Sequence, residues 1–496
     1  MWRSRRFRLG LSGLRQVVGD TMPNLSEDAN DSGSRRAWAL LLTAALLLTA
    51  ALLLAGCRSG GEEPTRAPAV EVDAAPAEEA AEPAPSGPPV RVGHLMRPEQ
   101  ARSVMTLAAG APAAVELAPL EVTDLDGLLR LLETDGAPDV VQVDLTWVLE
   151  LASAGRIVEV SDAAELAAHV RPLGGLVAWR GEVWAHPDRA WCQVVFAHRG
   201  LMEEAGLTRV PSDWDGLLRA ARRLTVDRSG RHSLHPEFDR SAVARHGLFM
   251  RSDLESAWGL IRSMGGGTVN VDTREALIDE AGGVKAARWL QGLRGRHGVT
   301  PGWLDAPVEA SEAMEIVTTG QVAMWVGSSA WIEELEGEGR IRDPEALWIG
   351  ALPVGEDGRG GCPAAGMGYV VTARTGEVEQ VEQARRVASW LASEPVQLHL
   401  GRRHRVIPSR LGARARLARV SRGSGVEQGV DPWVAAGLWS TGQARDRAVF
   451  PGMARLGESI NPLLVAIARG EREPSEALRR VAADWRVLMV ETIGAE

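Results

Sequence analysis

The segment from Val90 to Asp144 places the strongest limit on how this chain can fold. Val90–Leu95 and Ala114–Leu120 have the pattern of strands and precede an amphipathic stretch, and Pro138–Asp144 follows it with the pattern of a buried strand. The amphipathic stretch is typical of a helix. A strand, a helix and a strand in this order imply parallel pairing, so we expect an α/β fold.

The predicted helix in this segment carries its leucines on one face, at Leu125, Leu128, Leu129 and Leu132. Thr123–Asp126 has the arrangement of a capping box, and Gly136 is the predicted end of the helix. Amphipathic patterns predict two further helices, one capped by Ser212–Asp215 and one beginning at Pro474.

A long apolar run near the N-terminus indicates export. Ala37–Ala55 follows a basic pair and ends just before Cys57, as in a secretion signal. Leu54–Cys57 resembles a bacterial lipobox, in which the cysteine thiol receives lipid and becomes the new N-terminus. The alternative is a single transmembrane helix, because the run of 19 residues can span a bilayer. Only Arg58 follows the run closely, which is a poor stop-transfer pattern.

We therefore expect residues 1–56 to be a signal peptide, with Met22 as an alternative start. Residues 57–89 would then be the lipidated cysteine and an extended linker, because 58–89 holds seven Pro, eight Ala and seven acidic residues. Such a linker reaches at most ~100 Å. The expected location is outside the cytoplasm, in the periplasm or at the cell surface, with a lipid anchor in a bacterial membrane.

The charge of the chain excludes some partners. The net charge is −10 and becomes −13 once residues 1–56 are removed. An acidic protein repels the phosphates of nucleic acids, so we expect no nucleic-acid partner. It also offers no basic patch to anionic lipids, which leaves membrane attachment to the acyl chains.

Two cysteines remain besides Cys57. Cys192 and Cys362 could form a disulfide in an oxidising compartment, or they could be two isolated buried thiols. The sequence does not give their separation, so both alternatives stay open. No cysteine and histidine cluster has zinc-site spacing, and His232 and His235 fall in a polar stretch typical of a loop. We expect no metal and no cofactor.

Several segments in chain order carry a family resemblance. They are Pro138–Gly155, Gly181–Pro187, Phe196–Leu207, Pro211–Leu217, Thr319–Trp331, Leu352–Gly355 with Gly366–Ala373, and Ala388–Glu394 onward to Pro408. None is specific alone. Together, over about Val90 to Met489, they resemble the family 1 extracellular solute-binding proteins, the maltose-binding-protein-like sugar-binding group of ABC importers.

The resemblance implies a periplasmic-binding-protein fold of type II, with two α/β lobes, three crossings between them and a ligand cleft at their junction. On this basis the N-terminal lobe would comprise 90–194 with 352–407, and the C-terminal lobe 195–351 with 408–496. Clefts between domains are common sites for small molecules, and closure of the lobes around the ligand is a hinge motion.

The resemblance also implies which residues contact the ligand: Asp144, Trp147, Trp191, Trp331, Gly366, Tyr369, Trp433 and Trp439. A sugar offers C–H faces to aromatic planes and hydroxyl groups to carboxylates, amides and guanidinium groups. The alternative roles are core packing for the tryptophans and capping for Asp144. Other tryptophans have the pattern of structural or core residues: Trp214, Trp258, Trp289, Trp390 and Trp485.

The implied function is capture of a carbohydrate and its delivery to an ABC permease by a monomeric, non-enzymatic lipoprotein. Phe196–His198 departs from the family, which usually shows Tyr-Asn-Lys there, and Ala364–Ala365 replaces a common Gly and Trp. These departures keep open a second reading, in which the protein senses a ligand or binds a solute other than a carbohydrate. A secreted hydrolase is disfavoured, since no serine elbow, zincin motif or phosphate loop is present. Paired carboxylates of a glycosidase are not excluded by sequence.

The lipobox reading predicts that Cys57→Ala abolishes acylation of the exported protein, because the thiol that receives the lipid is gone. Metabolic labelling with a fatty-acid probe measures this, and Ser59→Ala serves as the control that keeps full labelling. Unchanged labelling of the Cys57→Ala protein would remove the lipobox assignment.

Overall fold

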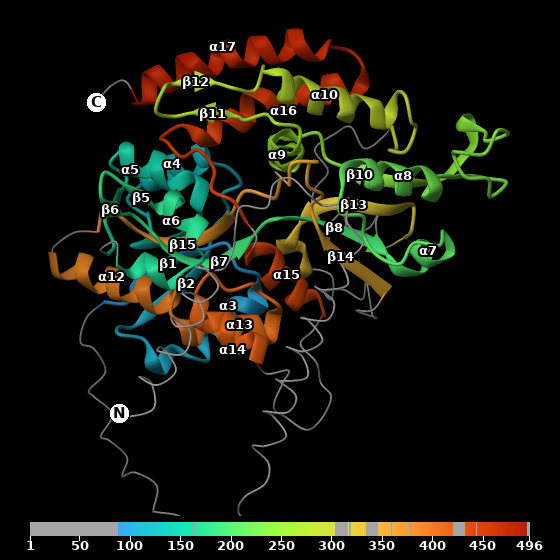
Figure 1. Ribbon diagram of the computed structural model, residues 1–496. Coiled ribbons are helices and arrows are strands. Elements are labelled where there is room, and N and C mark those ends of the chain that lie inside the picture. The colour runs from blue at the N-terminus through green and yellow to red at the C-terminus, as the bar shows by residue number, and fades with distance from the viewer. Residues whose placement is uncertain are drawn as a thin grey trace, which may run out of the picture. The chain divides into compact units, whose positions relative to one another are not determined.

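The computed structural model describes residues 88–161, 164–302, 316, 319–333, 346–358, 360–375, 378–419, 432–442 and 444–493 (Figure 1). The predicted signal segment, Cys57 and the linker up to residue 87 lie outside these residues. Within the part of the chain that is described, no helix combines the length and apolar character needed to cross a membrane.

The first sheet contains the segment from which the fold was predicted. Its strands run in the order β2-β1-β3-β15-β4, with β7 also paired to β15. The strands are β1 (Val90–His94), β2 (Val115–Pro119), β3 (Val140–Asp144), β4 (Ile157–Val158), β7 (His186–Trp191) and β15 (Ala365–Thr372). β1 pairs in parallel with β2 and with β3, which confirms the predicted parallel pairing. β15 is antiparallel to β3, β4 and β7.

The second sheet has the order β14-β8-β13-β10-β9. Its strands are β8 (Gln193–His198), β9 (Val226–Asp227), β10 (Val243–Met250), β13 (Val322–Ser328) and β14 (Leu347–Ala351). β8 is antiparallel to both β13 and β14, and β10 is parallel to β13. We call the elements around the first sheet the first lobe and those around the second sheet the second lobe.

Helices cover both sheets. The first lobe has α3 (Pro98–Met105), α4 (Leu125–Leu132), α5 (Val148–Ser153), α6 (Arg171–Val177), α12 (Val378–Leu391) and α13 (Glu394–His404). The second has α7 (Arg199–Glu204), α8 (Trp214–Leu224), α9 (Leu254–Ser263), α10 (Ala281–Arg294), α16 (Met453–Arg469) and α17 (Pro474–Ile493). α14 (Leu411–Arg419) packs on α13, and α15 (Pro432–Gly442) packs on β14 and β7. Two short hairpins, β5 (Ala178–Trp179) with β6 (Glu182–Val183) and β11 (Val269–Asn270) with β12 (Glu275–Ala276), complete the strands.

The chain passes from the first lobe to the second at Cys192, the single residue between β7 and β8. It returns through residues 352–364, between β14 and β15. A third passage follows α13 and leads to α16 and α17, which pack against α10 at the top of Figure 1. The architecture is the predicted two-lobed α/β fold, while the predicted lobe boundaries at 194, 351 and 407 stay predictions.

Two details of the predicted first helix were wrong. Asp124 caps α4, since its Oδ1 accepts from the backbone N–H of Gly127 at 2.6 Å, and no capping box involving Thr123 forms. The helix ends at Leu132 with Glu133 as its C-cap, four residues before Gly136. The predicted starts of α8 and α17 are confirmed, with Asp213 as the cap of α8.

A buried charge lies where the two lobes meet. Arg189 of β7 contacts Asp188 at 2.9 Å and Glu333 at 3.4 Å. Glu333 ends the 3₁₀ turn η5 (Ser329–Glu333) of the second lobe and also accepts from Gln100 Nε2 of α3 at 2.7 Å. Burial alone would lower the pKa of Arg189, but the two carboxylates raise it above its usual value. The first lobe therefore holds the second through a fully paired guanidinium group.

The packing of α8 on the second sheet depends on a residue without a side chain. A Cβ at Gly247 of β10 would lie 1.8 Å from the backbone oxygen of Ala221 in α8. The helix therefore approaches the strand at backbone distance, and the N–H of Gly247 donates to Thr225 Oγ1 at 2.9 Å.

We predict that Gly247→Ala lowers the free energy of unfolding by about 1–3 kcal/mol, because α8 must move away from the sheet. Thermal or urea unfolding measures the change. Gly200→Ala is the matched control, since a Cβ there meets nothing within 4 Å. Equal stability of the two variants would contradict the close approach of α8 to β10.

Candidate functional site

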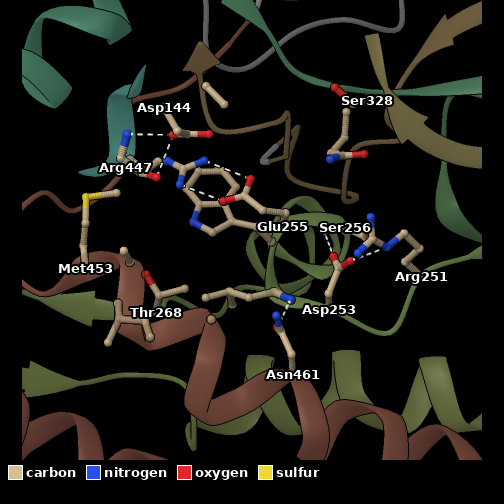
Figure 2. Close-up of a pocket in the computed structure, with 18 of the residues that line it drawn as sticks. Asp144, Arg251, Asp253, Glu255, Ser256, Thr268, Ser328, Arg447, Met453 and Asn461 are labelled. Carbon is tan, nitrogen blue, oxygen red and sulfur yellow. Dashed lines mark hydrogen bonds and ion pairs between the residues drawn. The ribbon is translucent and has the colours of Figure 1, made fainter. Parts of the chain in front are cut away.

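A cavity of about 400 Å³ lies at the junction of the two lobes (Figure 2). The first lobe contributes residues at the carboxyl end of β3, at the end of β7 and at the start of β15: Asp144, Thr146, Trp147, Trp191 and Ala365. The second lobe contributes Gln193, the start of α9 from Arg251 to Trp258, Thr268, the end of β13 with Trp331, and the segment from Arg447 into α16. A molecule bound here would touch both lobes.

Four tryptophans line this cavity. Trp147 and Trp191 are half-buried, so part of each ring faces the open space. Trp331 and Trp258 are each 7% exposed. The ring of Trp331 stacks near Phe196 with centroids 6.4 Å apart, and it would meet a Cβ at Gly327 at 2.5 Å. Trp331 therefore belongs both to the cavity wall and to the core of the second lobe.

A guanidinium group bridges the charged side of the cavity. Arg447 binds Glu255 with two hydrogen bonds, of 2.7 and 3.0 Å, beside Asp144 (Figure 2). Burial of Arg447 lowers its pKa, but Glu255 and Asp144 outweigh this effect and raise the pKa above its ordinary value. Arg447 therefore stays charged and keeps Glu255 of the second lobe close to Asp144 of the first.

Asp144 stabilises the local backbone and also lines the cavity. Its Oδ1 accepts from the N–H and from the hydroxyl of Thr146, at 2.8 and 2.7 Å, and so caps the 3₁₀ turn η2 (Leu145–Trp147). Burial raises the pKa of the carboxyl, and the hydrogen bonds from Thr146 act in the opposite direction. The capping role considered from the sequence is thus present, and the residue also lines the cavity.

Contacts within the second lobe hold the wall of the cavity that is formed by the start of α9. Asp253 caps α9 by accepting from the N–H of Ser256 at 2.8 Å, and it binds Arg251 at 2.7 Å. Asn461 of α16 accepts from the N–H of Leu254 at 2.8 Å (Figure 2). These contacts fix the start of α9 against α16.

Two buried polar atoms in the cavity wall have no hydrogen-bond partner among the described residues, Nε of Arg447 and the side-chain oxygen of Gln193. The side-chain oxygen of Gln193 is buried and accepts no hydrogen bond among the described residues. A buried amide oxygen without a donor is costly, so this position favours a ligand that carries a donor such as a hydroxyl group.

The structure brings four of the predicted ligand residues together: Asp144, Trp147, Trp191 and Trp331. It places three others outside the cavity. Gly366 lies against Arg189, where a Cβ would be 2.3 Å from the backbone oxygen, and Tyr369 is fully buried in the first lobe. Trp439 is 55% exposed and lines a second cavity beside β14. Trp433 lies in α15, and its side chain is outside the described part of the chain.

Sequence reasoning missed several residues of the wall: Gln193, Arg251, Asp253, Glu255, Trp258, Arg447 and Asn461. Asp253 alone carries a local signal, since an aspartate before an apolar helical stretch is typical of an N-cap. The others reach the cavity through tertiary packing. Trp258 was predicted to be core, and it is both buried and part of the wall.

The two cysteines predicted as a possible disulfide are both buried and both free in the structure. Among the described residues, no group of three or more histidine, cysteine, aspartate or glutamate side chains is arranged to hold a metal ion.

Comparison with known proteins places this geometry in a family. The sequence model for "Bacterial extracellular solute-binding protein" matches residues 121–398, which is more than half of the chain. Among solved structures, the GacH receptor of Streptomyces glaucescens aligns with a TM-score of 0.65 at 20% identity, covering 81% of this chain and 98% of its own. T. maritima MalE3, solved with maltose, aligns with a TM-score of 0.64 at 17% identity, covering 80% and 99%.

A solute-binding protein of an ABC transporter from Thermotoga lettingae, bound with α-D-tagatose, gives a TM-score of 0.64 at 18% identity and covers 80% of this chain and 98% of its own. At these identities the structural matches establish the fold, and the sequence model establishes the family. The chain belongs to the bacterial extracellular solute-binding proteins and has their two-lobed α/β fold.

Proposed function

We propose that this protein captures a carbohydrate in the cavity between its lobes and delivers it to an ABC permease, held at the membrane by lipid on Cys57. The observation that carries the proposal is the composition of the cavity wall. Tryptophan side chains and a charged hydrogen-bonding cluster line the same cavity, and both sets come from both lobes.

The two half-buried tryptophans supply the surface that a sugar ring needs. Trp147 and Trp191 each present part of an apolar ring to the cavity, against which the C–H face of a sugar can pack. The hydroxyl groups at the rim of such a ring both donate and accept hydrogen bonds. Asp144, Glu255 and the side-chain oxygen of Gln193 are acceptors for them, and Arg251 is a donor.

Capture requires that the ligand favour the closed lobes. A ligand that contacts Asp144 and Trp147 of the first lobe together with Arg251 and Ser328 of the second gains its full set of contacts only when the lobes are close. The binding free energy then shifts the population of the hinge toward closure. Such a mechanism needs no chemical change in the ligand.

The relatives support a carbohydrate as the ligand class. The GacH receptor was solved in complex with acarbose, MalE3 with maltose and the Thermotoga lettingae protein with tagatose. These ligands differ in size but share a hydroxyl-rich rim and apolar ring faces. We infer the same chemistry for the ligand of this chain.

Delivery and anchoring are inferred from the N-terminal sequence. An acylated Cys57 would retain the protein at the membrane, and the Pro- and Ala-rich linker would let the lobes reach a permease within ~100 Å. The acidic body favours a monomer that moves freely over an anionic lipid surface.

We predict that Trp147→Ala and Trp191→Ala each weaken saccharide binding by at least about 10-fold, because each removes an apolar face from the cavity. Titration calorimetry, or the ligand-dependent rise in melting temperature, measures the loss with a saccharide identified from a broad panel. A panel in which no saccharide raises the melting temperature of the unaltered protein would count against the carbohydrate assignment.

Trp439→Ala is the matched control for these variants, since this tryptophan lines the second cavity. This variant should bind saccharide as tightly as the unaltered protein. A loss of affinity in this variant alone would show that the ligand binds in the second cavity. Trp331→Ala is a poorer test, because truncation of a buried tryptophan costs about 3–5 kcal/mol of stability besides any lost ligand contact.

A further prediction concerns the unpartnered amide. Gln193→Met keeps the size of the side chain and removes the buried oxygen, so stability should be unchanged or slightly higher. Saccharide affinity should fall by about 10-fold if a ligand hydroxyl donates to that oxygen. A stable variant that binds with unaltered affinity would show that the ligand does not use Gln193.

A further inference from the structure

The two free cysteines lie in two different passages between the lobes. Cys192 is the only residue between β7 and β8, and Cys362 belongs to the segment that joins β14 to β15. Both are almost fully buried, with 3% and 5% of their surfaces exposed. They are distant in the sequence and are brought to the hinge by the fold.

The contacts around Cys362 show how close the two passages are. The backbone N–H of Gln193, the residue after Cys192, donates to Cys362 Sγ at 2.6 Å. Cys362 Sγ donates in turn to the backbone oxygen of Pro363 at 2.9 Å. Burial raises the pKa of Cys362 well above its usual range, and a hydrogen bond with the Cys192 thiol adds to this increase. The backbone directly after Cys192 therefore lies against the sulfur of Cys362.

The backbone on both sides of the pair is held in place. The N–H of Cys192 donates to Ser329 Oγ at 3.2 Å, and the N–H of Ser329 donates back to the oxygen of Cys192 at 2.8 Å. The oxygen of Cys362 accepts from the N–H of Arg445 at 2.8 Å. A disulfide requires two cysteines whose backbones lie close together, and these contacts fix the backbone at each of the two positions.

We propose that Cys192 and Cys362 form a disulfide that joins the first and second passages between the lobes when the protein is exported. The proposal rests on the export inferred above, because disulfides persist in oxidising compartments and not in the cytoplasm. The neighbouring residues Trp191, Gln193 and Ala365 line the candidate ligand cavity, so the bond lies directly behind it. It ties the hinge strands together and limits how they can move as the lobes open.

The bond forms by exchange with a disulfide-bearing oxidant, such as a thiol oxidoreductase or oxidised glutathione. One cysteine thiolate attacks the oxidant disulfide and releases one thiolate of the oxidant. The second cysteine loses its proton, attacks the mixed disulfide and releases the other. One S–S bond of the oxidant is thereby exchanged for one S–S bond in the protein, and the oxidant leaves as two thiols.

The surroundings of the folded pair disfavour the thiolate that this exchange needs, because burial raises the pKa of Cys362 well above its usual range and Cys192 and Glu255 add to this increase. Because both sulfurs are buried, we expect exchange to occur while the chain folds and to be slow once the lobes have formed.

Peptide mapping of the full chain, exported by its own signal, tests the bond. Free thiols are blocked with N-ethylmaleimide under denaturing conditions, and the protein is digested without reductant. We expect one linked peptide containing Cys192 and Cys362, which separates after reduction. Maleimide on both cysteines, before and after refolding with oxidised glutathione, would overturn the proposal. This test uses no sugar, so a failed saccharide panel leaves its result intact.

A stability measurement gives a second, independent readout. Protein refolded with oxidised glutathione should melt roughly 5–10 °C above protein refolded with reductant, because the bond closes a long loop. The double variant Cys192→Ser/Cys362→Ser should melt at one temperature under both conditions, and Cys57→Ser should keep the difference. Equal melting temperatures for both preparations of the unaltered protein would contradict a bond at the hinge.

Discussion

The junction of the lobes depends on one buried charge. Arg189 enters from β7 and is neutralised by Asp188 of its own strand and by Glu333 of the second lobe. A guanidinium group cannot be buried without such partners, so the strand and the η5 turn must lie where both carboxylates reach it. Gln142 Nε2 donates to Asp188 at 2.7 Å, and Gln100 Nε2 donates to Glu333 at 2.7 Å. The positions of β3 and α3, which carry these two glutamines, are therefore tied to the same buried charge.

The cavity follows from the same junction. η5 begins with Ser329, which exchanges two hydrogen bonds with Cys192, and ends with Glu333 on Arg189. Trp331 lies between them and forms part of the cavity wall. The residues that fix the two lobes behind the hinge and those that would contact a ligand are therefore neighbours in the same short segments. A change in the angle between the lobes must alter the cavity, and a ligand that prefers one angle can select it.

The residues predicted from the sequence line the cavity where their position depends on the end of a recognisable strand. Asp144 and Trp147 follow a buried parallel strand, and Trp191 precedes a passage between the lobes, so their places could be inferred from the order of elements. The sequence did not separate the cavity wall from the core for Trp331, which belongs to both, or for Tyr369, which is buried. Arg447 carries no local signal at all. It lies beside Asp144 because the chain, after the third passage, runs past the cavity on its way into α16.

The local pattern was also insufficient for the details of α4. Thr123–Asp126 allows several caps, and the geometry of the chain entering the helix selected Asp124. Similarly, Gly136 can adopt the backbone conformation of a helix C-terminus, but α4 already ends at Leu132. Such choices among nearby, nearly equivalent residues depend on the direction of the flanking strands, which no short segment encodes.

Taken by itself, the sequence determined the α/β class, the parallel start of the first sheet and the family, because hydrophobic periodicity, strand order and motif order depend on neighbouring residues. Tertiary structure alone decided which tryptophans face the cavity, which charges pair at the hinge, and that Cys192 and Cys362 meet. These depend on contacts between segments far apart in the chain, whose distances are set by packing and by the need to pair every buried charge.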